Sequence, residues 1–220
     1  MAEGIKIQIY RNETADSLTK KLADPSENAD IGSAAAASAA LAASMLARAA
    51  LQIREARGVD EKLDWYVRNT EILRSYMVKL IDEDVKCRGP LRRALKEGDD
   101  RRIEAARQAA VSICLEIVNM MGQCIDLALE MMAKAEGDAK AELSAGADLA
   151  YGASLAAGRY ILQMSRLSPD DTYRYVIKRE NELTMQAQKE AYDRVISAAA
   201  TEEFEYKRKD RTCTLSCFEL

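Results

Sequence analysis

A run of alanines with almost no charge, from Ser33 to Ile53, dominates the hydrophobic pattern of the chain. Alanine has the highest helix propensity because it loses almost no side-chain entropy on folding. A helix without a charged face is expected inside a bundle rather than on its surface. Arg48 lies within the run and alanine is weakly apolar, which argues against a membrane span. The pattern therefore predicts a buried central helix that ends at Gly58.

A second helix of small residues is predicted from Ser144 to Leu167, where Gly146, Gly152 and Gly158 are spaced six residues apart. Glycine inside a helix costs about 1 kcal/mol relative to alanine, so three glycines indicate close packing. The alanine helix is the natural partner. We therefore expect an all-α, single-domain helical bundle with two central Ala/Gly-rich helices.

Between these two helices, the pattern predicts another, from Asp60 to about Cys87, which ends before Gly89-Pro90. Its inward positions follow a 3-4 spacing and are Leu63, Tyr66, Thr70, Leu73, Met77 and Leu80. The next position in this spacing is Asp84. A buried carboxylate is costly unless it is paired or functional. Asp84 is therefore either a functional residue or the point where the helix emerges into solvent beside Asp82 and Glu83.

A long helix is predicted from Asp99 to about Ala135, and it is apolar almost all round between Ala109 and Met132. The exception is a polar seam formed by Ser112, Glu116, Asn119, Gln123, Asp126 and Glu130. Such a seam usually faces water, and the alternatives are a polar pocket wall or a subunit contact. The last helix is expected on the outside of the bundle, with Ser168 as its cap and Pro169 in its first turn.

The loop DPSENADIGS connects a short amphipathic helix, which ends at Ala23, to the alanine helix. A helix N-terminus presents unpaired N–H groups and the positive end of the helix dipole, which suits an anionic ligand. The alternative is a plain connecting loop. Residues 1–200 are expected to form the domain, and residues 201–220 a charged, flexible tail. Cys213 and Cys217 in this tail give only a weak signal for a disulfide or a metal site.

The amino-acid composition excludes several kinds of catalytic and binding site. The chain has 220 residues, a net charge of −4 and no histidine. Interleaved acids and bases argue against nucleic-acid binding. The start of the chain lacks a signal-peptide pattern, so we expect a cytoplasmic protein with reduced thiols and no membrane partner. Without histidine, histidine-based triads and the usual zinc sites are excluded and no metal is expected, so acid–base chemistry falls to carboxylates, tyrosine, lysine or water.

Asp148 is the one acid within the second small-residue helix, and the position four residues later is Gly152 rather than a base. We expect Asp148 to lie near Asp84, in a cleft bordered by residues 30–33. Two carboxylates that share a partly buried site repel each other, which raises the pKa of one and lets it donate a proton. Lys86, Arg88 and Arg159 are candidates for contacting an anionic ligand. The alternative is that both acids have a structural role, in which each caps a helix or forms an ion pair at a helix end.

Five short motifs occur in the same order as in a known protein family. They are Leu22-Ala23, Gly32-Ser33 at the start of the alanine helix, the acids Asp82 and Asp84, Cys114-Leu115-Glu116-Ile117, and Leu143-Ser144-Ala145-Gly146. From Leu18 to Ile196 the chain resembles the C-terminal domain of formiminotransferase-cyclodeaminase and the related methenyltetrahydrofolate cyclohydrolases. Asp30-Ile31 departs from the family's glycine-rich loop, and Cys87-Arg88 replaces a small–aromatic pair. Ser144 stands where the family has an aspartate.

The resemblance implies an all-α homodimer that binds a tetrahydrofolate derivative as its substrate and hydrolyses a 5,10-methenyl bridge or releases ammonia from a 5-formimino group. With the residues singled out above, the candidate catalytic residues are Asp84, Asp148 and Asp82. The candidate ligand-binding residues are Asp30, Gly32, Ser33, Ser144 and Arg159. Two alternatives stay open: a paralogue that keeps the bundle as a binding or interaction subunit, and the same scaffold with a less anionic ligand.

Overall fold

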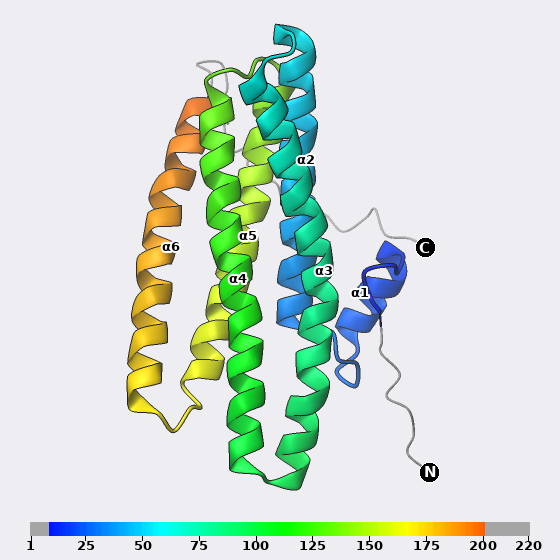
Figure 1. Ribbon diagram of the computed structural model, residues 1–220, viewed down its shortest axis with the longest axis vertical. Coiled ribbons are helices and arrows are strands. Elements are labelled where there is room, and N and C mark those ends of the chain that lie inside the picture. Colours follow the sequence, from blue (N-terminus) through cyan, green and yellow to red (C-terminus); the bar gives the residue numbers. More distant parts are fainter. Residues whose placement is uncertain (1–8, 201–220) are drawn as a thin grey trace, which may run out of the picture.

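Five long helices run side by side and alternate in direction, with a short helix against their lower half (Figure 1). The computed structural model describes residues 9–200. Its helices are α1 (Ala15–Ala23), α2 (Ile31–Arg57), α3 (Glu61–Glu97), α4 (Asp100–Met132), α5 (Asp138–Ser165) and α6 (Asp171–Ala199). The all-α prediction is confirmed, and no strand occurs within residues 9–200. The tail predicted at 201–220, with Cys213 and Cys217, lies outside the described residues.

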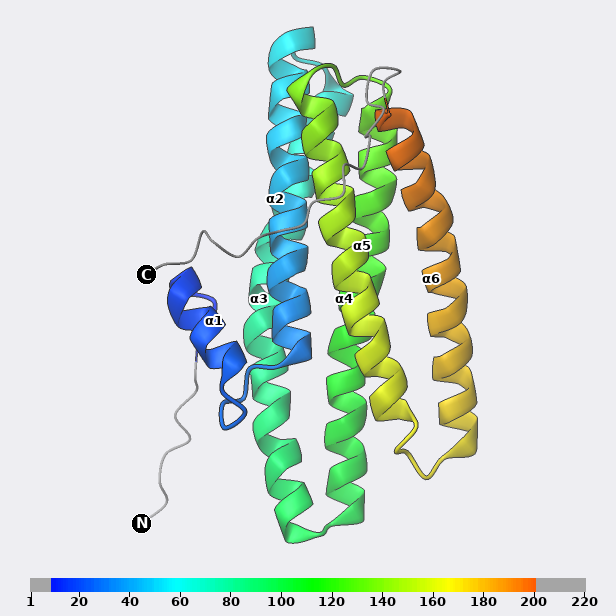
Figure 2. The same cartoon turned by 180° about the vertical axis from the view of Figure 1, so that it is seen from behind.

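Helices α2 and α5 pack closely against each other, as predicted, and Figure 2 shows them side by side. Gly146 makes the closest approach: a Cβ atom built on it would lie 2.2 Å from Leu46 Cδ1 and 3.2 Å from the Ala42 carbonyl oxygen. Gly158 instead faces Asn181 of α6, and Gly152 has nothing within 4 Å. The expectation that all three glycines serve the α2 contact is therefore wrong, because the rotation of α5 turns Gly152 outward.

Replacing Gly146 by alanine should destabilise the fold by about 1–3 kcal/mol, because the new methyl group meets Leu46 and the α2 backbone. Urea unfolding of the variant measures this loss. Gly152→Ala is the matched control, since it adds the same methyl group to the same helix in open space. Equal stability of the Gly146 variant and the wild type would contradict the described packing.

Three predicted helix boundaries are wrong. Helix α5 begins at Asp138 and not at Ser144. Helix α3 does not end near Cys87 but continues through Pro90 to Glu97. Proline interrupts one backbone hydrogen bond, yet Leu91 and Ala94 beyond it are buried, and this burial favours continuing the helix. Helix α6 begins two residues later than predicted, with Asp170 instead of Ser168 as its cap. The Ser168 hydroxyl donates to Glu104 of α4 instead.

The polar seam of α4 faces outward, as the simplest interpretation predicted, while its apolar faces pack on α2, α3, α5 and α6. The methionines and alanines of α4 are thus used within one chain and do not by themselves indicate a second subunit. By length and composition α2 and α4 could each cross a membrane. Half of each apolar stretch is buried inside the bundle, which is typical of core helices.

Candidate functional site

Asp84 continues the inward stripe of α3, and its side chain is fully buried. The alternative that the helix emerges into solvent at this point is therefore excluded. Its Oδ2 atom accepts a 2.7 Å hydrogen bond from the Ser33 hydroxyl of α2. Its Oδ1 atom has no hydrogen-bond partner. Among residues 9–200 no basic side chain forms an ion pair with Asp84, and the hydrogen bonds to its carboxyl group come from Ser33.

Gly32 allows the start of α2 to lie directly against this carboxyl group. A Cβ atom built on Gly32 would be 2.1 Å from Asp84 Oδ1 and 2.5 Å from its Cγ. No side chain fits in that space, so glycine is a steric requirement of the site. The predicted grouping of Gly32, Ser33 and Asp84 is thus present in the structure.

Burial raises the pKa of Asp84 to about 6, because the charged carboxylate loses its hydration. Hydrogen bonds from the side chain and the backbone of Ser33 act in the opposite direction and are the smaller effect. A carboxyl group with this pKa is present in both protonation states near neutral pH. It can therefore give or take a proton at low cost.

Arg88 lies one helical turn after Asp84 but turns towards other partners. Its guanidinium group forms an ion pair with Asp30 and lies 4.9 Å from the centre of the Tyr160 ring. Asp30 also caps α2, where its Oδ1 atom accepts a 3.0 Å hydrogen bond from the Gly32 N–H. Arg88 and Asp30 thus form one connected unit with the beginning of α2, next to Asp84.

Tyr160 is a member of this site that the sequence analysis missed. Its side chain is buried, its hydroxyl has no hydrogen-bond partner, and burial raises its pKa. A signal was present in the sequence: Tyr160 ends a 4-3-4-3 stripe of small residues on α5, and every member is buried. The stripe consists of Gly146, Ala150, Ala153, Ala157 and Tyr160. A tyrosine at the end of such a stripe brings a hydroxyl into the interior, where it needs a partner.

A hollow of about 460 Å³ lies on the outer side of the Asp30–Arg88 pair. It is lined by Leu22, Asp24, Pro25, Ala29, Asp30, Ile31, Ala34, Arg88 and Arg92. Arg92 is committed to the loop, since it donates to the carbonyl oxygens of Pro25, Ser26 and Glu27. The pair thus lies both on the wall of the hollow and beside the buried Asp84.

Asp82, predicted to be catalytic, anchors the segment that precedes α1. Its Oδ1 atom accepts hydrogen bonds from the backbone N–H groups of Tyr10, at 2.6 Å, and Arg11, at 3.0 Å. The Arg11 side chain adds an ion pair at 3.3 Å. Lys86 is exposed and pairs with Glu83. Neither Asp82 nor Lys86 belongs to the cluster around Asp84.

Asp148 does not lie near Asp84, and this part of the predicted site is wrong. It is exposed and accepts a 2.7 Å hydrogen bond from the Tyr192 hydroxyl of α6. It precedes Tyr160 by twelve residues, or about 18 Å along α5. Sequence spacing cannot set the rotation of a helix in which most residues are small, so the outward side was mistaken for a buried one.

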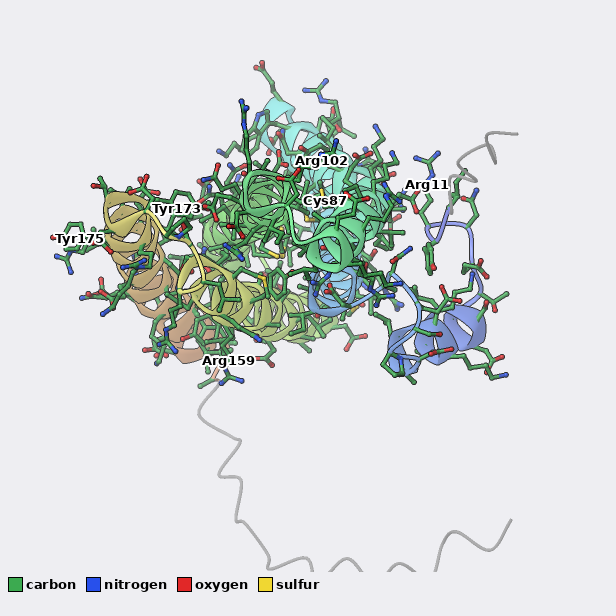
Figure 3. The ribbon with its side chains drawn as sticks, turned by 90° about the horizontal axis from the view of Figure 1, so that it is seen from below. Arg11, Cys87, Arg102, Arg159, Tyr173 and Tyr175 are labelled. Carbon is green, nitrogen blue, oxygen red and sulfur yellow. The ribbon has the colours of Figure 1, made fainter. Side chains whose placement is uncertain are left out.

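The two remaining predicted ligand contacts also lie apart from Asp84. Ser144 is one turn before Asp148 on α5, and its buried hydroxyl has no hydrogen-bond partner. Arg159 is exposed at the rim of the molecule, whereas Cys87, one turn from Asp84, lies near the middle (Figure 3). No cluster of three or more acidic or cysteine side chains suited to a metal ion occurs within residues 9–200.

Comparison with known proteins places this geometry in a family. The family model described as formiminotransferase-cyclodeaminase matches residues 14–183. The crystal structure of formiminotetrahydrofolate cyclodeaminase from Thermotoga maritima matches with a TM-score of 0.80 and 16% identity, covering 86% of this chain and 96% of that chain. No curated protein sequence matches. The chain belongs to the formiminotransferase-cyclodeaminase family.

Proposed function

We propose that this protein catalyses a one-carbon reaction of a tetrahydrofolate derivative, with Asp84 as the residue that transfers protons. The observation that carries the proposal is a buried carboxyl group with a pKa near 6 and one free oxygen. Membership of the family supports the substrate class. The shared fold with a formiminotetrahydrofolate cyclodeaminase supports the arrangement of the helices.

One carboxyl group is sufficient for the chemistry. In cyclodeamination, N10 of the folate attacks the formimino carbon, the bond from that carbon to its terminal nitrogen breaks, and ammonia leaves. Asp84 would accept the proton from N10 and deliver a proton to the departing nitrogen. In the related hydrolysis, water adds to the methenyl carbon and Asp84 would take its proton. The bond from that carbon to one ring nitrogen then breaks, and Asp84 would return the proton to that nitrogen. In both reactions a carboxylate stabilises the amidinium-like cation.

The alternative function is that of a binding or interaction subunit without catalysis. The full burial of Asp84 beside the Asp30–Arg88 pair favours this alternative, since a substrate must displace part of that arrangement to reach the carboxyl group. The two functions differ in one measurable respect, which is turnover.

The test is to add 5,10-methenyltetrahydrofolate and, separately, 5-formiminotetrahydrofolate, and to follow the near-ultraviolet absorbance of the methenyl form. The first substrate should lose this absorbance and the second should gain it, faster than with heat-denatured protein. A thermal shift with each compound measures binding independently. If neither turnover nor a shift is seen, the proposed substrate class is wrong and the interaction subunit is favoured.

We also propose that the protein is a homodimer that pairs through the outer side of α2. Ile31 and Leu41 expose 42% and 60% of their surface there, on a helix that is otherwise mostly small residues. Light scattering should give twice the chain mass of 24.4 kDa. Leu41→Glu should reduce it to a single chain, whereas Ile72→Glu, on the exposed side of α3, should not. A wild type that is monomeric at micromolar concentration would contradict the dimer.

A further inference from the structure

The Asp30 carboxylate occupies a place that is built for an anion. Its Oδ1 atom accepts the Gly32 N–H at the positive end of α2, and the same carboxylate pairs with Arg88. Both side chains are mostly shielded from solvent, with 19% of Asp30 and 18% of Arg88 exposed. The chain thus supplies, from the Asp30 side chain, the negative charge that these two positive groups attract.

Independent evidence for a ligand comes from the groups beside this pair. Asp84 and Tyr160 are 0% and 1% exposed. The Oδ1 atom of Asp84 and the hydroxyl of Tyr160 nevertheless have no hydrogen-bond partner. Arg88 Nε is a third buried polar atom without one. A buried polar group without a hydrogen-bond partner is costly, because it loses its hydration without a replacement. Three such groups around one ion pair indicate a place where a ligand or ordered water completes the hydrogen bonds.

The loop that carries Asp30 is fixed separately from the ion pair. Arg92 donates to the carbonyl oxygens of Pro25 and Ser26 at 3.0 and 2.6 Å, and also to that of Glu27. These bonds hold the loop against α3 without involving Asp30. Exchange of the anion on Arg88 therefore requires the Asp30 side chain to rotate and does not require the loop to open.

We propose that Asp30 is a displaceable internal occupant of an anion-binding subsite, and that a carboxylate- or phosphate-bearing ligand replaces it on Arg88 and the α2 N-terminus. Displacement connects the 460 Å³ hollow with the interior beside Asp84. The pair is thus an autoinhibitory contact. Its effect on turnover rests on the proposed function, whereas the anion subsite itself does not.

Asp30→Asn tests this proposal, because asparagine preserves the helix cap and removes the charge. Asp30→Ser, which also caps, is a second variant in case the first fails to fold. The control is Asp24→Asn, which removes one charge from the wall of the same hollow without touching Arg88. Calorimetric titration with inorganic phosphate and with glutarate, at constant ionic strength, measures binding without folate or turnover.

Both Asp30 variants should bind at least one of the two anions about tenfold more tightly than the wild type, a gain of about 1.4 kcal/mol. Asp24→Asn should show no such gain, and adding Arg88→Gln to Asp30→Asn should remove it. The anion with the larger gain identifies the ligand as a phosphate or a carboxylate. Unchanged affinity in the Asp30 variants, or an equal gain in the Asp24 variant, would overturn the subsite. Failure of the folate assay alone would leave this result unaffected.

Discussion

Asp84→Asn is expected to abolish folate turnover and at the same time to stabilise the folded protein at neutral pH. The substitution preserves the shape of the side chain and removes its ability to transfer a proton. General acid–base catalysis contributes about 10²- to 10⁴-fold in rate, so turnover should fall by at least the lower figure. A merely structural carboxylate would not couple a loss of activity to a gain of stability.

The stability change follows from the raised pKa. Burial raises the pKa of Asp84 from 3.8 to about 6, so between these values the folded protein binds more protons than the unfolded chain. The free energy of unfolding of the wild type therefore falls as the pH rises through this window, by on the order of 2–3 kcal/mol. The asparagine variant lacks this loss. The free energy of unfolding of the variant should therefore equal that of the wild type near pH 4 and exceed it by the full amount above about pH 6.

Urea unfolding of both proteins at pH 4.5 and pH 7.5 measures the difference. Asp148→Asn is the control, because that carboxylate is exposed and the same substitution there should leave both turnover and pH dependence close to those of the wild type. An Asp84 variant with undiminished turnover, or with the pH dependence of the wild type, would show that Asp84 is not the proton-transferring residue.

Gly32→Ala should be the most destabilising of the glycine substitutions, at about 3 kcal/mol or more. The added methyl group would lie 2.1 Å from Asp84 Oδ1, and Asp84 cannot move away without weakening its bond from Ser33. Overpacking of a core typically costs about 1–3 kcal/mol, and a weakened hydrogen bond to a buried charged group adds to this. Thermal unfolding measures the loss.

Gly152→Ala again serves as the control for Gly32→Ala, since nothing lies within 4 Å of that position. The Gly152→Ala variant should be more stable than the wild type by up to about 1 kcal/mol, because alanine has the higher helix propensity. If Gly32→Ala were as stable as the wild type, the start of α2 could not lie against Asp84 as described.

The burial of Asp84 could be predicted because the side chains of α3 differ strongly in character. Large apolar residues and charged residues alternate there with helical spacing, so periodicity alone identifies the inward side and extends it to Asp84. Proximity of Gly32 and Ser33 to Asp84 was not available from spacing, because the residues lie on different helices. It followed from the resemblance to a family whose motifs include both segments.

The position of Asp148 could not be assigned in the same way. On α5 almost every position is small, so the sequence pattern gives little information about which side faces the core. The rotation follows from packing against α2, α4 and α6, as in the contact of Gly146 with Leu46, and such contacts are properties of two helices together. Pro90 illustrates a related limit: local propensity favours a break, while burial of the residues beyond it keeps α3 continuous.

The anchoring of the N-terminal segment on Asp82 has a practical consequence for anyone who trims the chain. The family match begins at residue 14, which invites a cut that keeps every helix and removes Tyr10 and Arg11. Their backbone N–H groups are the hydrogen-bond donors to Asp82, whose side chain is buried two residues before Asp84. A protein shortened in this way would carry an unsatisfied buried charge on the same helix as the catalytic candidate. If such a protein were inactive, the cause would be the loss of the donors to Asp82, and the result would say nothing about the role of Asp84.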